Sequence, residues 1–147
     1  MLQLYSDSGT YGNITFSATL ILKDRKECMT FFCKQYKDLA SPVVGEILAV
    51  QQGLEWIIEN ASDCMDVEIY VDSMSVGQVL AGNSSGAYSD LWRSLCLLRD
   101  CFHMTKIYHV KAHQPTHNPN KTCDMLCSAL LKPYKKEAKC TQQLLPS

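Results

Sequence analysis

Long hydrophobic runs are missing from this chain of 147 residues, since no apolar stretch reaches the roughly 18 residues that a membrane-spanning helix needs. The first residues, MLQLYSDSG, lack the basic segment followed by an apolar stretch that marks a secretory signal peptide. An excess of positive charge is missing too, because 14 Lys and Arg stand against 15 Asp and Glu. We therefore expect an intracellular, cytoplasmic protein that has no membrane contact and is not a strongly basic nucleic-acid-binding protein.

Paired Cys-x-x-Cys motifs are also absent, although the chain contains eight cysteines. Such pairs are typical of structural zinc sites. Most of the cysteines stand among apolar neighbours in predicted strands or helices, where a reduced thiol acts as a small hydrophobic side chain. The sequence therefore predicts reduced core thiols and neither a zinc site nor a disulfide framework.

Hydrophobic periodicity predicts an α/β order of elements. In chain order, we expect three strands at 2–8, 14–22 and 27–36, a helix at 41–60, a strand at 67–71, helices at 73–80 and 90–102, a strand at 106–110 and a helix from 119. Three strands joined by short turns favour an antiparallel meander, and the later strands, reached through helices, favour a parallel portion. No repeat or linker divides the chain, so we expect one domain at 1–132 and a basic, flexible C-terminal tail at 133–147.

Four carboxylates occupy suggestive positions in this order: Asp7, Glu46, Asp72 and Asp124. Asp7 and Asp72 are expected at the ends of strands, where parallel α/β sheets place their sites. We place Glu46 in the first turn of the long helix and Asp124 early in the last helix. Each alone is most simply explained as a turn residue or a partner of the helix dipole. Several carboxylates converging at one sheet edge would repel one another unless divalent cations bind, and such oxygen ligands suit Mg²⁺ or Mn²⁺.

Four sequence blocks connect these carboxylates to a known family: YSDSGTYGN, GEILAVQQGLE, YVDSMSVGQVL and VKAHQPTHNPNKTCDML. In order and spacing they resemble the motif blocks of the type 1 ribonuclease H family, over a stretch from about Leu2 to Leu131. The resemblance implies a ribonuclease H-like fold, with a five-stranded mixed sheet flanked by helices. It also implies hydrolysis of the RNA strand of an RNA–DNA hybrid, leaving 5′-phosphate and 3′-hydroxyl ends. Two Mg²⁺ ions, or Mn²⁺ in their place, would be bound by Asp7, Glu46, Asp72 and Asp124.

The resemblance also implies a catalytic histidine on the loop before the last helix. His113 follows the last strand within Val-Lys-Ala-His, as the family's histidine does, and would shuttle protons or help the product leave. The loop is one residue longer than the family pattern, so His117 competes for this role.

Substrate contacts are expected from residues near the carboxylates, and here the chain departs from the family. The candidate substrate-binding residues are Ser8, Asn13, Ser73, Met74 and Asn120. Val43, Val44 and Met74 stand where the family often has two asparagines and a glutamine, and their side chains cannot donate hydrogen bonds to a hybrid. Lysines such as Lys106 are the remaining candidates for phosphate contact. We expect the chain to recognise a hybrid weakly or through contacts that differ from those of the family.

Three other functions compete with the hybrid nuclease. A non-catalytic ribonuclease H-fold domain used for nucleic-acid binding or assembly would explain the altered substrate contacts, but such domains often lose a metal carboxylate. Other nucleases or transferases of the superfamily start with an Asp-x-Glu motif, which YSDSGT lacks, or end on a differently spaced glutamate. A small-molecule α/β enzyme would need a glycine-rich loop after a strand, and AGNSSGA does not follow one. We expect a monomer, which is either free-standing or part of a larger polypeptide.

Overall fold

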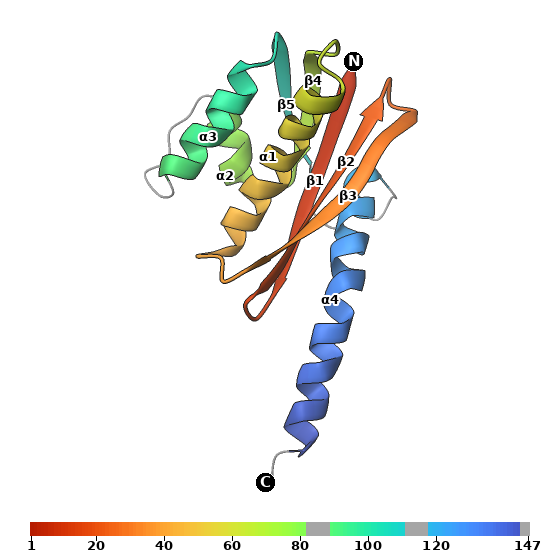
Figure 1. Cartoon of the computed structure of the whole chain (residues 1–147), viewed down its shortest axis with the longest axis vertical. Coiled ribbons are helices and arrows are strands. Elements are labelled where there is room, and N and C mark those ends of the chain that lie inside the picture. The colour runs from red at the N-terminus through yellow and green to blue at the C-terminus, as the bar shows by residue number, and fades with distance from the viewer. Residues whose placement is uncertain (82–88, 111–117, 145–147) are drawn as a thin grey trace.

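The computed structural model describes residues 1–81, 89–110 and 118–144, and these form one sheet with helices on both of its faces (Figure 1). The elements are β1 (Leu2–Tyr11), β2 (Ile14–Lys23), β3 (Glu27–Lys37), α1 (Pro42–Asn60), β4 (Asp66–Val71), α2 (Met74–Leu80), α3 (Ser89–Asp100), β5 (Met104–His109) and α4 (Pro119–Leu144). The strand order is β3-β2-β1-β4-β5. Strands β1, β2 and β3 pair antiparallel, whereas β4 pairs parallel with β1 and with β5. The predicted five-stranded mixed sheet is confirmed.

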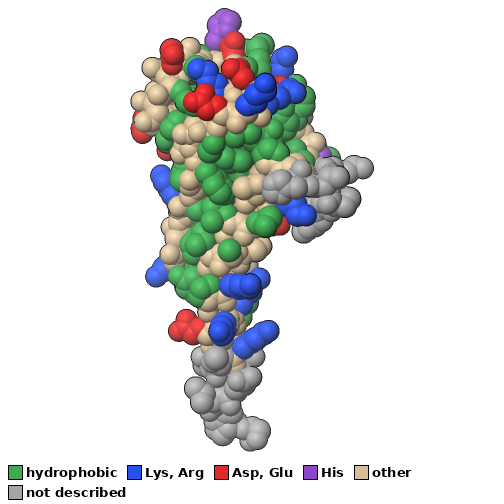
Figure 2. Space-filling view, turned by 90° about the vertical axis from the view of Figure 1, so that its right-hand side faces the viewer, with side chains coloured by type: hydrophobic (Ala, Val, Ile, Leu, Met, Phe, Trp, Pro, Cys, Tyr) green, Lys and Arg blue, Asp and Glu red, His purple; other side chains and the backbone are tan. Residues whose placement is uncertain are grey.

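Alternation along β1 sends successive side chains to opposite faces of the sheet. Leu2 and Leu4 are fully buried in the main core, which α1, α2 and α3 cover. Tyr5 belongs to a second cluster on the other face, where β2 packs against α4. From the right-hand side of Figure 1, hydrophobic side chains form a broad surface between the charged upper end of the molecule and the lysine-rich lower part of α4 (Figure 2).

Helix α1 lies unusually close to the sheet at one glycine. A Cβ atom on Gly53 would stand 2.6 Å from Leu4 Cδ1 and 2.8 Å from Thr19 Cγ2, which is shorter than real contacts allow. The Thr19 hydroxyl donates to the Ala49 carbonyl at 2.6 Å across the same junction. This close approach fixes the height of α1 over the sheet.

Helix α4 is longer than predicted. We expected it to give way to a tail at residue 133, but it continues to Leu144 with Pro133 inside it. The Tyr134 ring packs 6.1 Å from the Phe16 ring, and its hydroxyl accepts a hydrogen bond from Gln35 Nε2 at 3.3 Å. Lys135 lies 6.0 Å from the ring centre of Tyr11. The predicted domain boundary at residue 132 therefore falls within a helix whose next turn packs against the first hairpin.

Strand β1 is also longer than predicted, because it pairs with β2 as far as Tyr11. Asp7 therefore lies inside a strand and not at its end. Every cysteine whose side chain the structure describes is free; Cys123 and Cys127 are buried, whereas Cys28 and Cys101 are exposed and are not the core thiols that were predicted. Within the described ranges, no helix combines the length and the apolar character needed to cross a bilayer.

Candidate active site

The parallel pairing of β1 and β4 brings Asp7 and Asp72 together. The last residue pair of this parallel ladder is Tyr5 with Tyr70. Asp7 follows Tyr5 by two residues, and Asp72 follows Tyr70 by two residues. Because side chains alternate along a strand, both carboxylates lie on the face of the sheet that carries α4. The side chains of Asp7 and Asp72 interact directly.

Asp7 stands in an environment that disfavours its charged form. The residue is only 7% exposed, and its Oδ1 accepts one hydrogen bond, from the Ser8 backbone N–H at 2.8 Å. Burial and then the repulsion of Asp72 raise its pKa to about 8, with a further contribution from Asp124. The pKa of Asp72 is raised as well, chiefly by its own burial. Among the described residues, neither carboxylate forms an ion pair with a Lys or Arg side chain.

Glu46 joins this pair from α1. The helix begins at Pro42 and has no acidic residue in its first turn, so Glu46 lies one turn deeper than predicted. Its carboxylate accepts a hydrogen bond from the Ser73 side chain and feels the charge of Asp72, and burial raises its pKa. The Ser73 hydroxyl also accepts from the Val76 N–H at 3.3 Å and so caps α2, as predicted.

Asp124 is positioned by two buried cysteines of α4. Cys123 Sγ lies 3.7 Å from the Tyr5 carbonyl oxygen, and Cys127 Sγ lies 3.8 Å from that of Asp7. These contacts hold the first turns of α4 against β1. The neighbouring half-buried Asp124 thereby comes within interaction range of both Asp7 and Asp72.

The chemistry of this group fits a divalent cation. All four members offer carboxylate oxygens, which Mg²⁺ and Mn²⁺ prefer. No Lys or Arg in the described part of the chain forms an ion pair with any of them. Among those residues, no three Asp, Glu, His or Cys side chains already enclose a position for an ion. The case for a divalent cation therefore rests on the four carboxylate side chains and on the raised pKa values of three of them, Asp7, Glu46 and Asp72.

The predicted substrate-binding residues are spread along the same end of the sheet. Ser8 is half-buried and faces Gly45 of α1, whereas Met74 is 63% exposed. Asn13 lies in the β1–β2 turn, six residues beyond Asp7, and donates to Asp38 Oδ1 at 3.3 Å. The four residues of strand from Asp7 to Tyr11 span roughly 13 Å, so Asn13, in the turn beyond them, lies well outside the carboxylate group.

Asn120 differs from the others because it is only 6% exposed. Its Oδ1 has no hydrogen-bond partner in the described structure. Asn120 is thus a buried residue of the first turn of α4, four positions before Asp124, and not an exposed contact.

Val44 is buried and so does not face a substrate groove, contrary to the expectation, whereas Val43 is half-buried and keeps part of its surface exposed. Val44 is 6% exposed, and half-buried Val43 packs against the main core. The turn that opens α1 lies against the sheet, so apolar side chains at these two positions contribute packing. Met74 is the more exposed apolar replacement next to the carboxylates.

The two loop histidines of the prediction, His113 and His117, lie outside the described residues. No role was predicted for a third histidine, His109. Its Nε2 donates a hydrogen bond to the Asp72 carbonyl oxygen at 3.0 Å, and its ring moderates the pKa of Asp72. His109 pairs with Val71 at the ends of two parallel strands, and this position next to Asp72 is what could have indicated its role.

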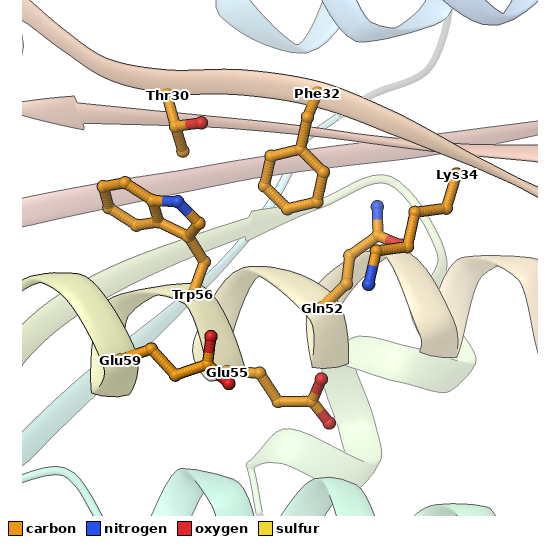
Figure 3. Close-up of a pocket in the computed structure, with 7 residues that line it drawn as sticks. All are labelled: Thr30, Phe32, Lys34, Gln52, Glu55, Trp56 and Glu59. Carbon is orange, nitrogen blue, oxygen red and sulfur yellow. The ribbon is translucent and has the colours of Figure 1, made fainter.

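A separate groove of about 330 Å³ lies between β3 and α1 (Figure 3). Trp56 and Gln52 of α1 point toward Thr30 and Phe32 of β3, and Glu55 lies below them. None of the predicted site residues lines this groove.

Comparison with protein families agrees with this arrangement. The sequence profile of the family described as "Reverse transcriptase-like" matches residues 10–128, which include Glu46, Asp72 and Asp124. The chain belongs to this family. It is a ribonuclease H-like member, as its similarity to solved ribonuclease H structures also indicates.

Three solved structures illustrate this similarity. RNase H1 from the halophilic archaeon Halobacterium salinarum has a TM-score of 0.73 at 20% identity, covering 90% of this chain and 98% of that one. LC11-RNase H1 in complex with an RNA/DNA hybrid has a TM-score of 0.66 at 14% identity, covering 76% and 86%. The prototype foamy virus protease-reverse transcriptase has a TM-score of 0.67 at 15% identity, covering 87% of this chain and 20% of that one. No curated protein matches the chain.

Proposed function

We propose that this chain is a metal-dependent endonuclease that hydrolyses the RNA strand of RNA–DNA hybrids. The observation that carries the proposal is the convergence of Asp7, Asp72 and Asp124, with Glu46 joined to them through Ser73, at one end of the sheet. Family membership supports a hydrolase that acts on nucleic acid. The hybrid as substrate is supported by the relative that was solved with one.

The four carboxylates would hold two divalent cations, Mg²⁺ or Mn²⁺. Bound there, the cations would lower the pKa of an attacking water and neutralise charge on the scissile phosphate and the leaving 3′ oxygen. Asp7 and Asp72 would hold the cations once both side chains are ionised, since carboxylate oxygens are the ligands that Mg²⁺ and Mn²⁺ prefer. Ser73 fixes the Glu46 carboxylate, and His109 fixes the backbone at Asp72. The products would carry 5′-phosphate and 3′-hydroxyl ends.

Selection of RNA would come from contacts to 2′-hydroxyls across the minor groove of the hybrid. Ser8, Ser73 and Met74 are adjacent to the carboxylates, whereas Asn13 would reach the DNA strand farther along. His113, on the undescribed loop, would transfer protons or help the product leave. The chain would act either alone or within a larger polypeptide, an arrangement that the foamy virus relative illustrates.

Cleavage of an end-labelled RNA–DNA hybrid in Mg²⁺, and then in Mn²⁺, tests this proposal. Duplex RNA and duplex DNA serve as competing substrates. We expect hybrid-specific cleavage that Asp72→Asn abolishes. Asp63→Asn makes the same chemical change at an exposed turn residue and should leave cleavage unchanged. Folded protein that cleaves none of the substrates in either metal would instead favour the non-catalytic domain.

A further inference from the structure

Three tyrosines stack across the sheet next to the carboxylate group. Tyr5, Tyr70 and Tyr108 are register partners on β1, β4 and β5. The rings of Tyr5 and Tyr70 are 4.5 Å apart at 10°, and those of Tyr70 and Tyr108 are 5.0 Å apart at 16°. The three rings therefore form one continuous stack, whose last member is Tyr108 on the edge strand β5.

A polar network fixes the orientation of this stack. Tyr108 hydrogen-bonds to the buried carboxylate of Glu68, which also accepts from Gln3 at 3.0 Å and pairs with Arg25 at 3.3 Å. Although burial opposes ionisation, these partners keep the pKa of Glu68 below its ordinary value. The Tyr108 ring is thus held at both its hydroxyl and one face.

The other face of Tyr108 is available. The residue is 40% exposed, and in the described ranges no ring or cation packs against that face. Helix α4 covers β1 and β2 and leaves this part of the sheet open. Lys106 is exposed two residues earlier on the same strand, hence on the same face. The stack therefore ends in a pre-oriented aromatic surface beside a cation, a combination that suits a nucleobase and its phosphate.

The open ring is also close to the proposed site of hydrolysis. Tyr70 and Asp72 are two residues apart on one face, and the Val110 N–H donates to the Val71 carbonyl at 2.8 Å at the same level. Two strand residues span roughly 7 Å, about the length of one extended nucleotide. A strand bound at the carboxylates could thus continue over Tyr108.

We propose that the outer face of Tyr108 is a stacking subsite for a single-stranded nucleotide that flanks the hybrid, with Lys106 contacting its phosphate. This inference rests on the proposed function, because the carboxylate group places the nucleic acid. It adds a sequence-tolerant contact to the proposed site.

Equilibrium binding in EDTA tests the subsite without hydrolysis. Fluorescence anisotropy would compare a blunt hybrid with hybrids that carry a 5′ or a 3′ single-stranded overhang, each with and without bases in the overhang. We expect the base-containing overhang at one end to tighten binding roughly 5- to 150-fold, which is the range for one base on an aromatic ring. Tyr108→Leu should remove this gain, and Tyr108→Phe should retain most of it.

Phe31→Leu provides the matched control, since Phe31 is 41% exposed on the opposite edge strand β3. It should leave the overhang effect intact, and thermal melts would verify that each variant is folded. The subsite would be overturned by equal affinity for blunt and overhanging hybrids, or by no binding of any hybrid. It would also be overturned if Phe31→Leu lost the affinity gained from the overhang to the same extent as Tyr108→Leu. Tyr108-dependent binding by a chain that cleaves nothing would leave the subsite standing and remove only the nuclease.

Discussion

Asp7 and Asp72 lie side by side because Tyr5 and Tyr70 form the last pair of the parallel ladder between β1 and β4. A change in pairing by one residue would send one of the two carboxylates to the opposite face of the sheet. The position of the charge pair is therefore a property of the register, which the cores on both faces specify. Its electrostatic consequence is repulsion between the two carboxylates, which adds to burial in raising the pKa of Asp7.

The first prediction concerns the pH dependence of stability in EDTA. The Asp7 pKa rises from an ordinary 3.8 to about 8 on folding, so the folded chain holds a proton there that the unfolded chain has released. Stability is then greatest below about pH 4 as far as this group is concerned, and it falls as the pH rises toward 8. The raised pKa values of Glu46 and Asp72 act in the same direction. Urea unfolding across this window measures the slope.

Asp7→Asn isolates the contribution of Asp7 to this slope. The variant removes the titrating group and one charge of the pair, so the fall in stability between about pH 4 and pH 8 should become distinctly shallower. A free energy of unfolding that rises with pH over the same window in both proteins would contradict this account of the site.

The second prediction concerns the cation itself. Mg²⁺ or Mn²⁺ should raise the melting temperature at about pH 8, since binding to the folded state alone adds about 2.7 kcal/mol when the ion is at a hundred times its dissociation constant. Asp72→Asn should be more stable than the unchanged chain in EDTA, because it removes a half-buried carboxylate and the repulsion that Asp72 exerts on Asp7. The same variant should lose most of the stabilisation by metal.

Differential scanning fluorimetry with and without each metal provides this measurement. Asp63→Asn, an exposed turn position, should melt and respond to metal like the unchanged chain. An identical metal response in Asp72→Asn would show that the ions bind elsewhere.

The sequence predicted the parts of this molecule that depend on local pattern. Alternating and helical periodicities located every described element, and the four motif blocks identified the carboxylates that the sheet then brings together. Val44 was misjudged because motif comparison places a residue in the chain and does not show which way a helix face turns. The role of His109 depends on its register against Val71, which is a non-local property.

The end of α4 shows a second limit of sequence reasoning. Proline usually ends a helix, because it lacks an N–H and clashes with the preceding turn. The apolar spacing of Leu126, Leu130 and Tyr134 nevertheless continues past Pro133, and these side chains pack against the second core. Tertiary packing here outweighs the local penalty.

The third prediction tests that packing. Tyr134→Ala should lower the free energy of unfolding by about 1–3 kcal/mol, less than the 3–5 kcal/mol typical of a fully buried aromatic residue, because Tyr134 is only half-buried. The loss combines its contact with Phe16 and its hydrogen bond with Gln35. Lys136→Ala, an exposed change in the same turn, should remain within about 0.5 kcal/mol. Equal stability of all three proteins in urea would mean that α4 detaches from the hairpin beyond residue 132.

The fourth prediction concerns the height of α1 above the sheet, which sets where Glu46 stands. Gly53→Ala forces a methyl group against Leu4 and Thr19, and such overpacking costs about 1–3 kcal/mol. Gly77→Ala makes the same change in α2, where the nearest atom, Val71 Cγ2, would be at an ordinary 3.5 Å. There the gain in helix propensity should stabilise the chain by about 0.5–1 kcal/mol. In chemical denaturation, Gly53→Ala should therefore lower the free energy of unfolding and Gly77→Ala should raise it. An unchanged free energy of unfolding in Gly53→Ala would mean that α1 can move away from the sheet without cost. Because lifting α1 would carry Glu46 away from Asp72, hydrolysis by Gly53→Ala should also fall, even where the protein remains fully folded.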